Sequence, residues 1–183
     1  MPSAEPATRA VDDAELITAW QGGDEAAASE LVRRHARALA RFLSGAGAPD
    51  ADLEDLVQVS FIRAFRSIGR FRGQCRFRTW LFTIGGNALK DLGRRMGRRQ
   101  VVPLDERIAT RDGDPAQRAE ASETEERLRR GLERLTGMQR EVFLLRAQQG
   151  LEYEEIAVAL ATSTGAARVH YHHAVKRLKE WLQ

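Results

Sequence analysis

Hydrophobic residues recur every three or four positions through most of the chain, which is the spacing of an α-helix that buries one face. The strongest run follows Asp52, and its apolar members are Leu53, Leu56, Val57, Phe61, Ala64, Phe65 and Ile68. No segment competes with the alternation of apolar and polar residues that marks a strand. The pattern therefore predicts an all-α fold.

Four helices are predicted in the N-terminal half. A short helix follows Asp12 and ends at Gly22–Gly23, after which Asp24 can cap a second helix that runs through Leu43. The run described above is the third helix. The fourth begins near Arg76 and continues to about residue 95. These helices are enough for one compact bundle.

The helical pattern fails after this bundle, where prolines and glycine interrupt it, hydrophobic residues become sparse, and acidic residues outnumber basic ones. The predicted organisation is a loose tail (residues 1–11), a small helical domain (12–99), a flexible linker (100–124) and a second small helical domain (125–183).

The second domain has the pattern of a helix-turn-helix, with a turn at residues 162–164 before a long last helix. Polar groups that can reach DNA recur along this last helix at Arg168, His172, Lys176 and Lys179. An apolar stripe has the same spacing, at Ala167, Tyr171, Val175 and Leu178. One face can pack while the other enters a major groove, so we expect this unit to read a promoter or operator.

Aromatic and basic residues alternate over residues 71–82, a composition suited to unstacked bases and phosphates. Helical spacing assigns the apolar members and their successors to a buried stripe, namely Phe77, Trp80, Leu81, Ile84, Ala88 and Leu92. The opposite face is polar and basic, with Arg76, Thr79, Thr83, Asn87, Lys90 and Arg94. The pair Gly85–Gly86 inside this helix indicates a close approach of either another helix or DNA.

The composition excludes several classes of protein but does not by itself identify one. The chain is 43% hydrophobic and 30% charged, with a formal net charge of only +3, so local basic clusters carry the argument. The single cysteine excludes an intramolecular disulfide. No apolar run is long enough for a membrane span or a signal peptide. We expect a cytoplasmic protein without membrane insertion.

Three other features have competing interpretations. His170, His172 and His173 invite a metal site, but only the first and last share a helical face and no acidic or Cys residue completes the ligand set. Cys75 lies among arginines that would lower a thiol pKa and favour redox sensing, although a half-buried loop position explains it better. His35 is expected at the surface. We predict no metal and no cofactor.

Several motifs occur together and in order. They are residues 52–58 (DLEDLVQ) with 61–65 (FIRAF), the block from Phe71-Arg72-Gly73 to Trp80-Leu81, residues 140–146 (REVFLLR), and residues 153–157 (YEEIA). With these motifs the chain resembles bacterial RNA polymerase sigma factors of the extracytoplasmic-function group, over nearly everything from Leu16 to Leu182.

The resemblance implies roles for particular residues. Asp55, Gln58 and Arg63 would dock on the clamp helices of the core polymerase. The residues implied to open the −10 element and hold an extruded base are Arg72, Gly73, Arg76, Thr79, Thr83, Asn87, Lys90 and Arg94. Those implied at the −35 element are Arg146, Arg168, Val169, His172, His173 and Lys176.

The resemblance also implies partners: core polymerase through its clamp helices and flap, promoter DNA, and an anti-sigma protein that covers the polymerase-binding surfaces. The acidic linker would thread toward the RNA exit path. His170 and His173 stand where the family commonly has Arg, so promoter preference can differ. The competing hypotheses are a conventional repressor or activator, which would leave residues 52–58 unexplained, and a metal-dependent nuclease or phosphohydrolase, whose carboxylate cluster or phosphate loop is not visible.

Overall fold

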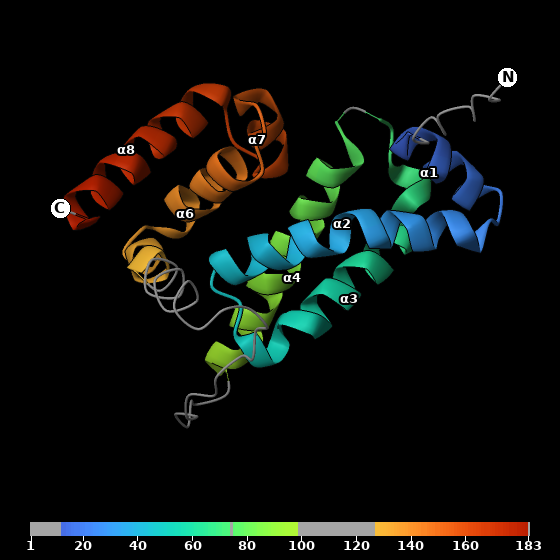
Figure 1. Cartoon of the computed structure of the whole chain (residues 1–183), viewed down its shortest axis with the longest axis horizontal. Coiled ribbons are helices and arrows are strands. Elements are labelled where there is room, and N and C mark those ends of the chain that lie inside the picture. The colour runs from blue at the N-terminus through green and yellow to red at the C-terminus, as the bar shows by residue number, and fades with distance from the viewer. Residues whose placement is uncertain (1–11, 74, 99–126, 183) are drawn as a thin grey trace, which may run out of the picture.

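The computed structural model describes residues 12–73, 75–98 and 127–182, and every regular element within these ranges is helical (Figure 1). The N-terminal unit consists of α1 (Asp13–Gln21), α2 (Glu25–Gly45), α3 (Asp50–Ser67), a 3-10 turn (Ile68–Arg70) and α4 (Phe77–Arg98). The all-α prediction is confirmed. The predicted tail and linker lie outside the described residues.

Side-chain caps explain where the first two helices begin. Asp12 and Glu15 form a reciprocal capping box at the start of α1. The Asp24 carboxylate accepts from the backbone N–H of Ala26 at 2.9 Å and of Ala27 at 3.4 Å, as the sequence predicted. The third helix begins two residues earlier than expected, directly after Pro49, which occupies its N-cap.

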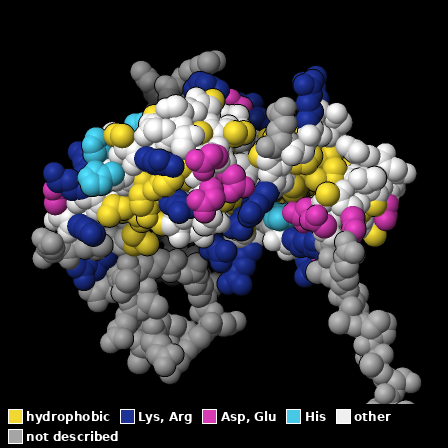
Figure 2. All heavy atoms as spheres, turned by 90° about the horizontal axis from the view of Figure 1, so that it is seen from above, with side chains coloured by type: hydrophobic (Ala, Val, Ile, Leu, Met, Phe, Trp, Pro, Cys, Tyr) yellow, Lys and Arg dark blue, Asp and Glu magenta, His cyan; other side chains and the backbone are white. Residues whose placement is uncertain are grey.

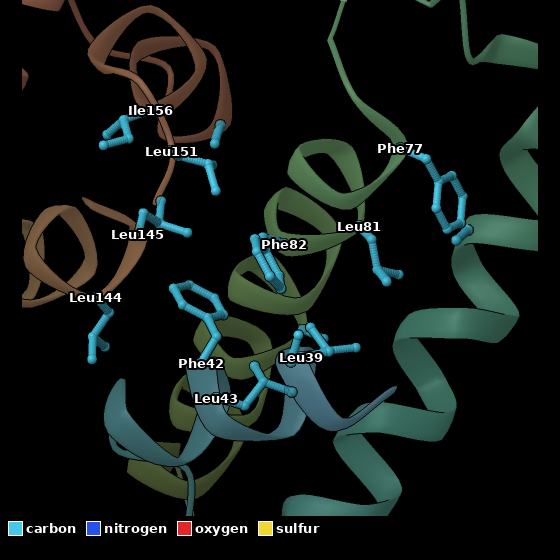
Figure 3. Close-up of a cluster of buried hydrophobic side chains, with 14 of the residues drawn as sticks. Leu39, Phe42, Leu43, Phe77, Leu81, Phe82, Leu144, Leu145, Leu151 and Ile156 are labelled. Carbon is cyan, nitrogen blue, oxygen red and sulfur yellow. The ribbon is translucent and has the colours of Figure 1, made fainter. Parts of the chain in front are cut away.

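The crossing of α2 and α4 forms the centre of the N-terminal unit. Leu39, Phe42 and Leu43 of α2 are fully buried, and the ring of Phe42 lies 5.2 Å from that of Phe82 in α4 (Figure 3). A methyl group placed on Gly85 would lie only 2.8 Å from Leu39 Cδ1. The sequence left open whether another helix or DNA approaches the glycine pair closely. At Gly85 the close neighbour is another helix, α2.

His35 corrects one expectation, because it is buried with only 8% of its surface exposed. Its Nε2 lies 2.7 Å from an Asp13 carboxylate oxygen, and its ring is 5.4 Å from that of Phe77. His35 follows Leu31 by four residues and precedes Leu39 by four, so it shares the buried face of α2. Burial lowers the pKa of His35, and the Asp13 carboxylate opposes this shift.

The C-terminal unit contains a helix over residues 127–133, α6 (Gly137–Phe143), a π-helical continuation (Leu144–Gln148), α7 (Tyr153–Ala159) and α8 (Thr164–Leu182). Thr136 and Gln139 form a capping box at the start of α6. The side of α8 that packs inward is formed by Ala167, Ala174 and Leu178. The predicted stripe members Tyr171 and Val175 are half-buried beside them. This arrangement is the expected helix-turn-helix.

The two units share one continuous apolar cluster. Leu144 lies against Gly45 at the end of α2, and the Arg140 side chain donates to the backbone carbonyl of Ala46 at 3.3 Å. Figure 3 shows Leu144 and Leu145 on the side of the cluster facing Phe42. Farther along, α7 packs on α4. No helix in the described ranges has the length and apolar character that a bilayer crossing requires.

Candidate nucleic-acid interface

The outward face of α8 carries exposed polar and apolar side chains near its N-terminus. The Ser163 hydroxyl accepts from the backbone N–H of Ala166 at 3.1 Å and so caps the helix. Arg168, His172, His173 and Lys176 are exposed on the helix, as is Val169, of whose surface 53% is accessible. In Figure 2, His, Lys and Arg side chains gather at the end of the molecule that carries α8.

Two arginines meet beside Tyr153 on this same surface. The guanidinium carbon of Arg146 lies 4.9 Å from the centre of the Tyr153 ring, and that of Arg168 lies 5.5 Å from it. Arg146 also pairs with Glu152 at 2.9 Å, and Arg168 with Glu154 at 3.8 Å. Four charged side chains thus form one cluster around a tyrosine.

The histidines of α8 do not form a metal site in the part of the chain that the structure describes. His172 and His173 are exposed neighbours whose rings are 6.2 Å apart, while His170 is half-buried. Among the residues that the structure describes, no three His, Cys, Asp or Glu side chains are grouped so as to hold a metal ion.

The predicted polar side of α4 is only partly open to solvent. We use the term α4 polar face for Arg76, Thr83, Asn87, Lys90 and Arg94, of which Thr83 is half-buried and the others are exposed. Thr79 was expected to belong to this face and does not, because it is 1% exposed. Its hydroxyl lies 3.5 Å from Glu155 Oε1 of α7, which covers this part of the helix.

Several polar contacts join the α4 polar face to the helix-turn-helix unit. Arg76 Nε lies 3.5 Å from Glu155 Oε1, and Lys90 Nζ lies 3.1 Å from Glu141 Oε2. Between them, Arg78 donates to the side-chain oxygen of Gln149. Two of the basic residues predicted to act on the −10 element, Arg76 and Lys90, are therefore paired with acidic residues of the helix-turn-helix unit.

A hollow of about 590 Å³ lies next to this contact. Its lining residues are Gly69, Arg70, Phe71, Arg72, Cys75, Trp80 and, from α7, Val158. The rings of Phe71 and Trp80 are 5.1 Å apart. Cys75 is half-buried, and burial followed by the Glu155 charge raises its thiol pKa. This shift is opposite to the one that a reactive thiolate requires.

The outer face of α3 forms a second candidate surface. Asp55 and Gln58 are exposed on it, together with Val59 and Ile62, which are 37% and 42% exposed. Arg63 lies at its border, paired with Asp91 of α4 at 2.9 Å. Sequence reasoning missed the two apolar residues. The spacing 55, 58, 59 and 62 was a signal for them, because it places all four on one helical face.

The fold thus defines a protein of two packed helical units, the second of which is a helix-turn-helix. Residues 31–99 match the family model for sigma-70 region 2, and residues 125–178 match that for sigma-70 region 4.

Known proteins resemble the whole chain. The RNA polymerase sigma factor NccH of Alcaligenes xylosoxydans is 34% identical, over 94% of this chain and 95% of that protein. The extracytoplasmic-function (ECF) sigma factor SigE of Mycolicibacterium smegmatis is 34% identical, over 99% and 70%. The structure of CnrH bound to the cytosolic domain of CnrY is similar with a TM-score of 0.72 at 30% identity, covering 93% and 96% of the two chains. The chain belongs to the sigma-70 family and to its extracytoplasmic-function group.

Proposed function

We propose that this protein binds the core of RNA polymerase and directs it to promoters whose −10 and −35 elements its two units recognise. The outer face of α3 would dock on the clamp helices of the polymerase through Asp55, Gln58 and the border residue Arg63. Exposed apolar side chains, here Val59 and Ile62, beside charged ones are typical of a protein-binding surface. The second unit would also reach the polymerase flap.

The −35 element would lie along α8. Arg168 and Val169 stand exposed on the first turns of this helix, where helix-turn-helix proteins contact base edges. A guanidinium can donate two hydrogen bonds to a guanine, and a valine can contact a thymine methyl group. His172, His173 and Lys176 would follow the groove farther along, and Arg146 would hold a phosphate.

The −10 element would lie on the α4 polar face and the adjoining loop. Asn87, Lys90 and Arg94 supply hydrogen-bonding and cationic groups along one side, and Arg72 and Gly73 lie beside the hollow that contains Phe71. Such a hollow can receive an unstacked base, whose extrusion costs a few kcal/mol. Because α7 covers Thr79, we infer that the two units separate before this face engages DNA.

An anti-sigma protein is a further partner that we infer. The related CnrH was solved in complex with the cytosolic domain of CnrY. A helical bundle that presents the exposed α3 surface offers such a protein a place to compete with polymerase. We infer a regulatory role without enzymatic activity, carried out in the cytoplasm, where the chromosome and polymerase are found.

The observation that carries the proposal is the exposed recognition helix α8 on a chain whose other unit matches sigma-70 region 2. Run-off transcription tests it, with purified core polymerase, the full chain and the DNA upstream of the gene as template. We expect initiation at a defined site only when the chain is added. Tight binding of the free chain to duplex DNA without any initiation would favour a repressor or activator and refute the proposal.

Variants separate the proposed surfaces in the same assay. Arg168→Ala should reduce transcription from a template with an intact −35 element, while leaving retention of core in a pull-down unchanged. Changing Asp55 and Gln58 to Ala should reduce core retention instead. Equal retention of core would show that the docking surface lies elsewhere.

A further inference from the structure

The cluster around Tyr153 contains a feature that the proposed roles leave unexplained. Its ring lies within cation–π distance of two arginines that come from different elements, Arg146 from the π-helical segment and Arg168 from α8. A half-buried tyrosine in a helix-turn-helix needs only apolar neighbours to be stable. Two guanidinium groups on one ring indicate that the tyrosine takes part in an interaction at the surface of the unit.

The ring is held in place by two other aromatic side chains. Tyr171 meets Tyr153 edge-on at 6.1 Å and 71°, and Phe143 stacks on Tyr171 at 6.1 Å and 15°. All three rings are half-buried and form one row. Aromatic side chains have few rotatable bonds, so a ring fixed in this way is a rigid support.

The other partners of the arginines are oxygen atoms, because Arg146 also donates to the backbone carbonyl of Leu151 at 2.8 Å and each arginine pairs with one carboxylate. Glu152 holds Arg146, and Glu154 holds Arg168, and both glutamates are exposed. A DNA phosphate or a base acceptor would compete with these carboxylates for the same N–H donors. The face of a neutral ring does not compete in this way, because it attracts the cation through its quadrupole and carries no formal charge.

We propose that Tyr153 is a positioning residue for DNA recognition, which holds Arg146 and Arg168 at a fixed spacing while DNA displaces Glu152 and Glu154. This role rests on the proposed contacts of the two arginines with the −35 region. Without the ring, each long side chain would have to be ordered when DNA binds, at a cost in conformational entropy. The ring therefore raises the affinity for the −35 element without contacting DNA.

The test compares Tyr153→Leu with Tyr153→Phe in holoenzyme reconstituted from core polymerase and the full chain. The DNA is an upstream fragment that supports run-off transcription, with its −35 element intact or scrambled. Because DNA must then order two arginine side chains, binding to the intact fragment should weaken by roughly fivefold to a hundredfold. Phe keeps the aromatic face and should retain most of the affinity. Equal loss in the Leu and Phe variants would overturn the proposal.

A double-mutant cycle excludes a merely structural role. In a chain that already carries Arg146→Ala and Arg168→Ala, Tyr153→Leu should cause no further loss of affinity. A loss as large as in the wild-type background would refute the positioning role. If Leu unfolds the unit, as circular dichroism would show, Tyr153→Met fills the space with a flexible apolar side chain and serves in the same cycle. Failure of the wild-type holoenzyme to distinguish the two fragments would instead refute the proposed function.

Discussion

Gly85 offers a sharp test of how closely α2 and α4 approach. An alanine methyl group there would lie 2.8 Å from Leu39 Cδ1, 3.4 Å from Ser60 Oγ and 3.5 Å from Leu43 Cδ2. None of these neighbours can move aside easily, because all three are fully buried and the Ser60 hydroxyl donates to Leu56 O at 2.6 Å. Inserting a methyl group into such a core costs about 1–3 kcal/mol.

The intrinsic preference of helices works in the opposite direction. Replacing Gly by Ala in a helix interior gains up to about 1 kcal/mol. Gly85→Ala should therefore leave the protein between about 0 and 2 kcal/mol less stable than wild type. Gly93 lies in the same helix with nothing within 4 Å of the added methyl. Gly93→Ala should therefore gain stability from the helix preference without any cost from a clash. The two variants should differ by about 1–3 kcal/mol.

Urea unfolding followed by circular dichroism measures this difference through the transition midpoints. Gly86→Ala is a second control within the glycine pair, because its methyl would lie at an ordinary 3.9 Å from Phe42 Cε1. We expect it to be neutral or stabilising. If Gly85→Ala is as stable as Gly93→Ala, the two helices do not cross as closely as the structure shows, and the explanation of this glycine is wrong.

Three further predictions concern pH, strand opening and the contact between the units. Burial lowers the pKa of His35, so the unfolded chain binds its proton first, and stability should fall as the pH drops below about 6.5; His35→Gln should reduce this dependence in pH-dependent melts. Asn87→Ala with Arg94→Ala should reduce permanganate reactivity of the −10 thymines more than core binding. In Lys90→Glu the new carboxylate should repel Glu141, which reduces the fraction of chains with the two units in contact by up to about fivefold and increases the scattering radius of the free chain. Adding Glu141→Lys to this variant should restore the ion pair and the wild-type radius.

The sequence predicted the helices well because each buries one continuous face. The helices expected at α2, α3 and α4 were found, and the caps at Asp12 and Asp24 explain two of the starts. The helix-turn-helix was equally clear, since its turn and exposed polar residues are local features. Local periodicity is sufficient wherever a helix has one buried side.

The sequence prediction was wrong at two kinds of position. One is a helix that packs on two sides, and the other is a buried polar residue whose partner is distant in the sequence. Thr79 and Phe82 lie outside the predicted stripe of α4, yet both are buried, because α7 and α2 also pack on this helix. The period of 3.6 residues identifies one face and cannot reveal a second neighbour from a distant part of the chain. His35 was placed at the surface because arginines surround it in the sequence, and its partner Asp13 is 22 residues away.

The contact between the two units contains buried polar groups that weaken it. Arg78 and Gln149 bond to each other there, but Arg78 Nε and Gln149 Nε2 are buried without a partner among the described residues. A buried polar atom left unpaired costs about 1–3 kcal/mol, which offsets part of the apolar burial at Leu144 and Leu145. Burial, followed by the nearby charges of Arg41 and Arg76, also lowers the pKa of Arg78.

Under the proposed function, DNA would replace two ion pairs across the same boundary. Arg76 and Lys90 pair with Glu155 and Glu141, and a nucleic-acid backbone offers the same cations a denser row of negative charge. Separation of the units would therefore exchange two carboxylates for phosphates and return water to the unpaired atoms. If the α4 polar face binds DNA as proposed, the acidic residues of the helix-turn-helix unit would cover it in the free chain, and binding to polymerase and promoter would favour the open form.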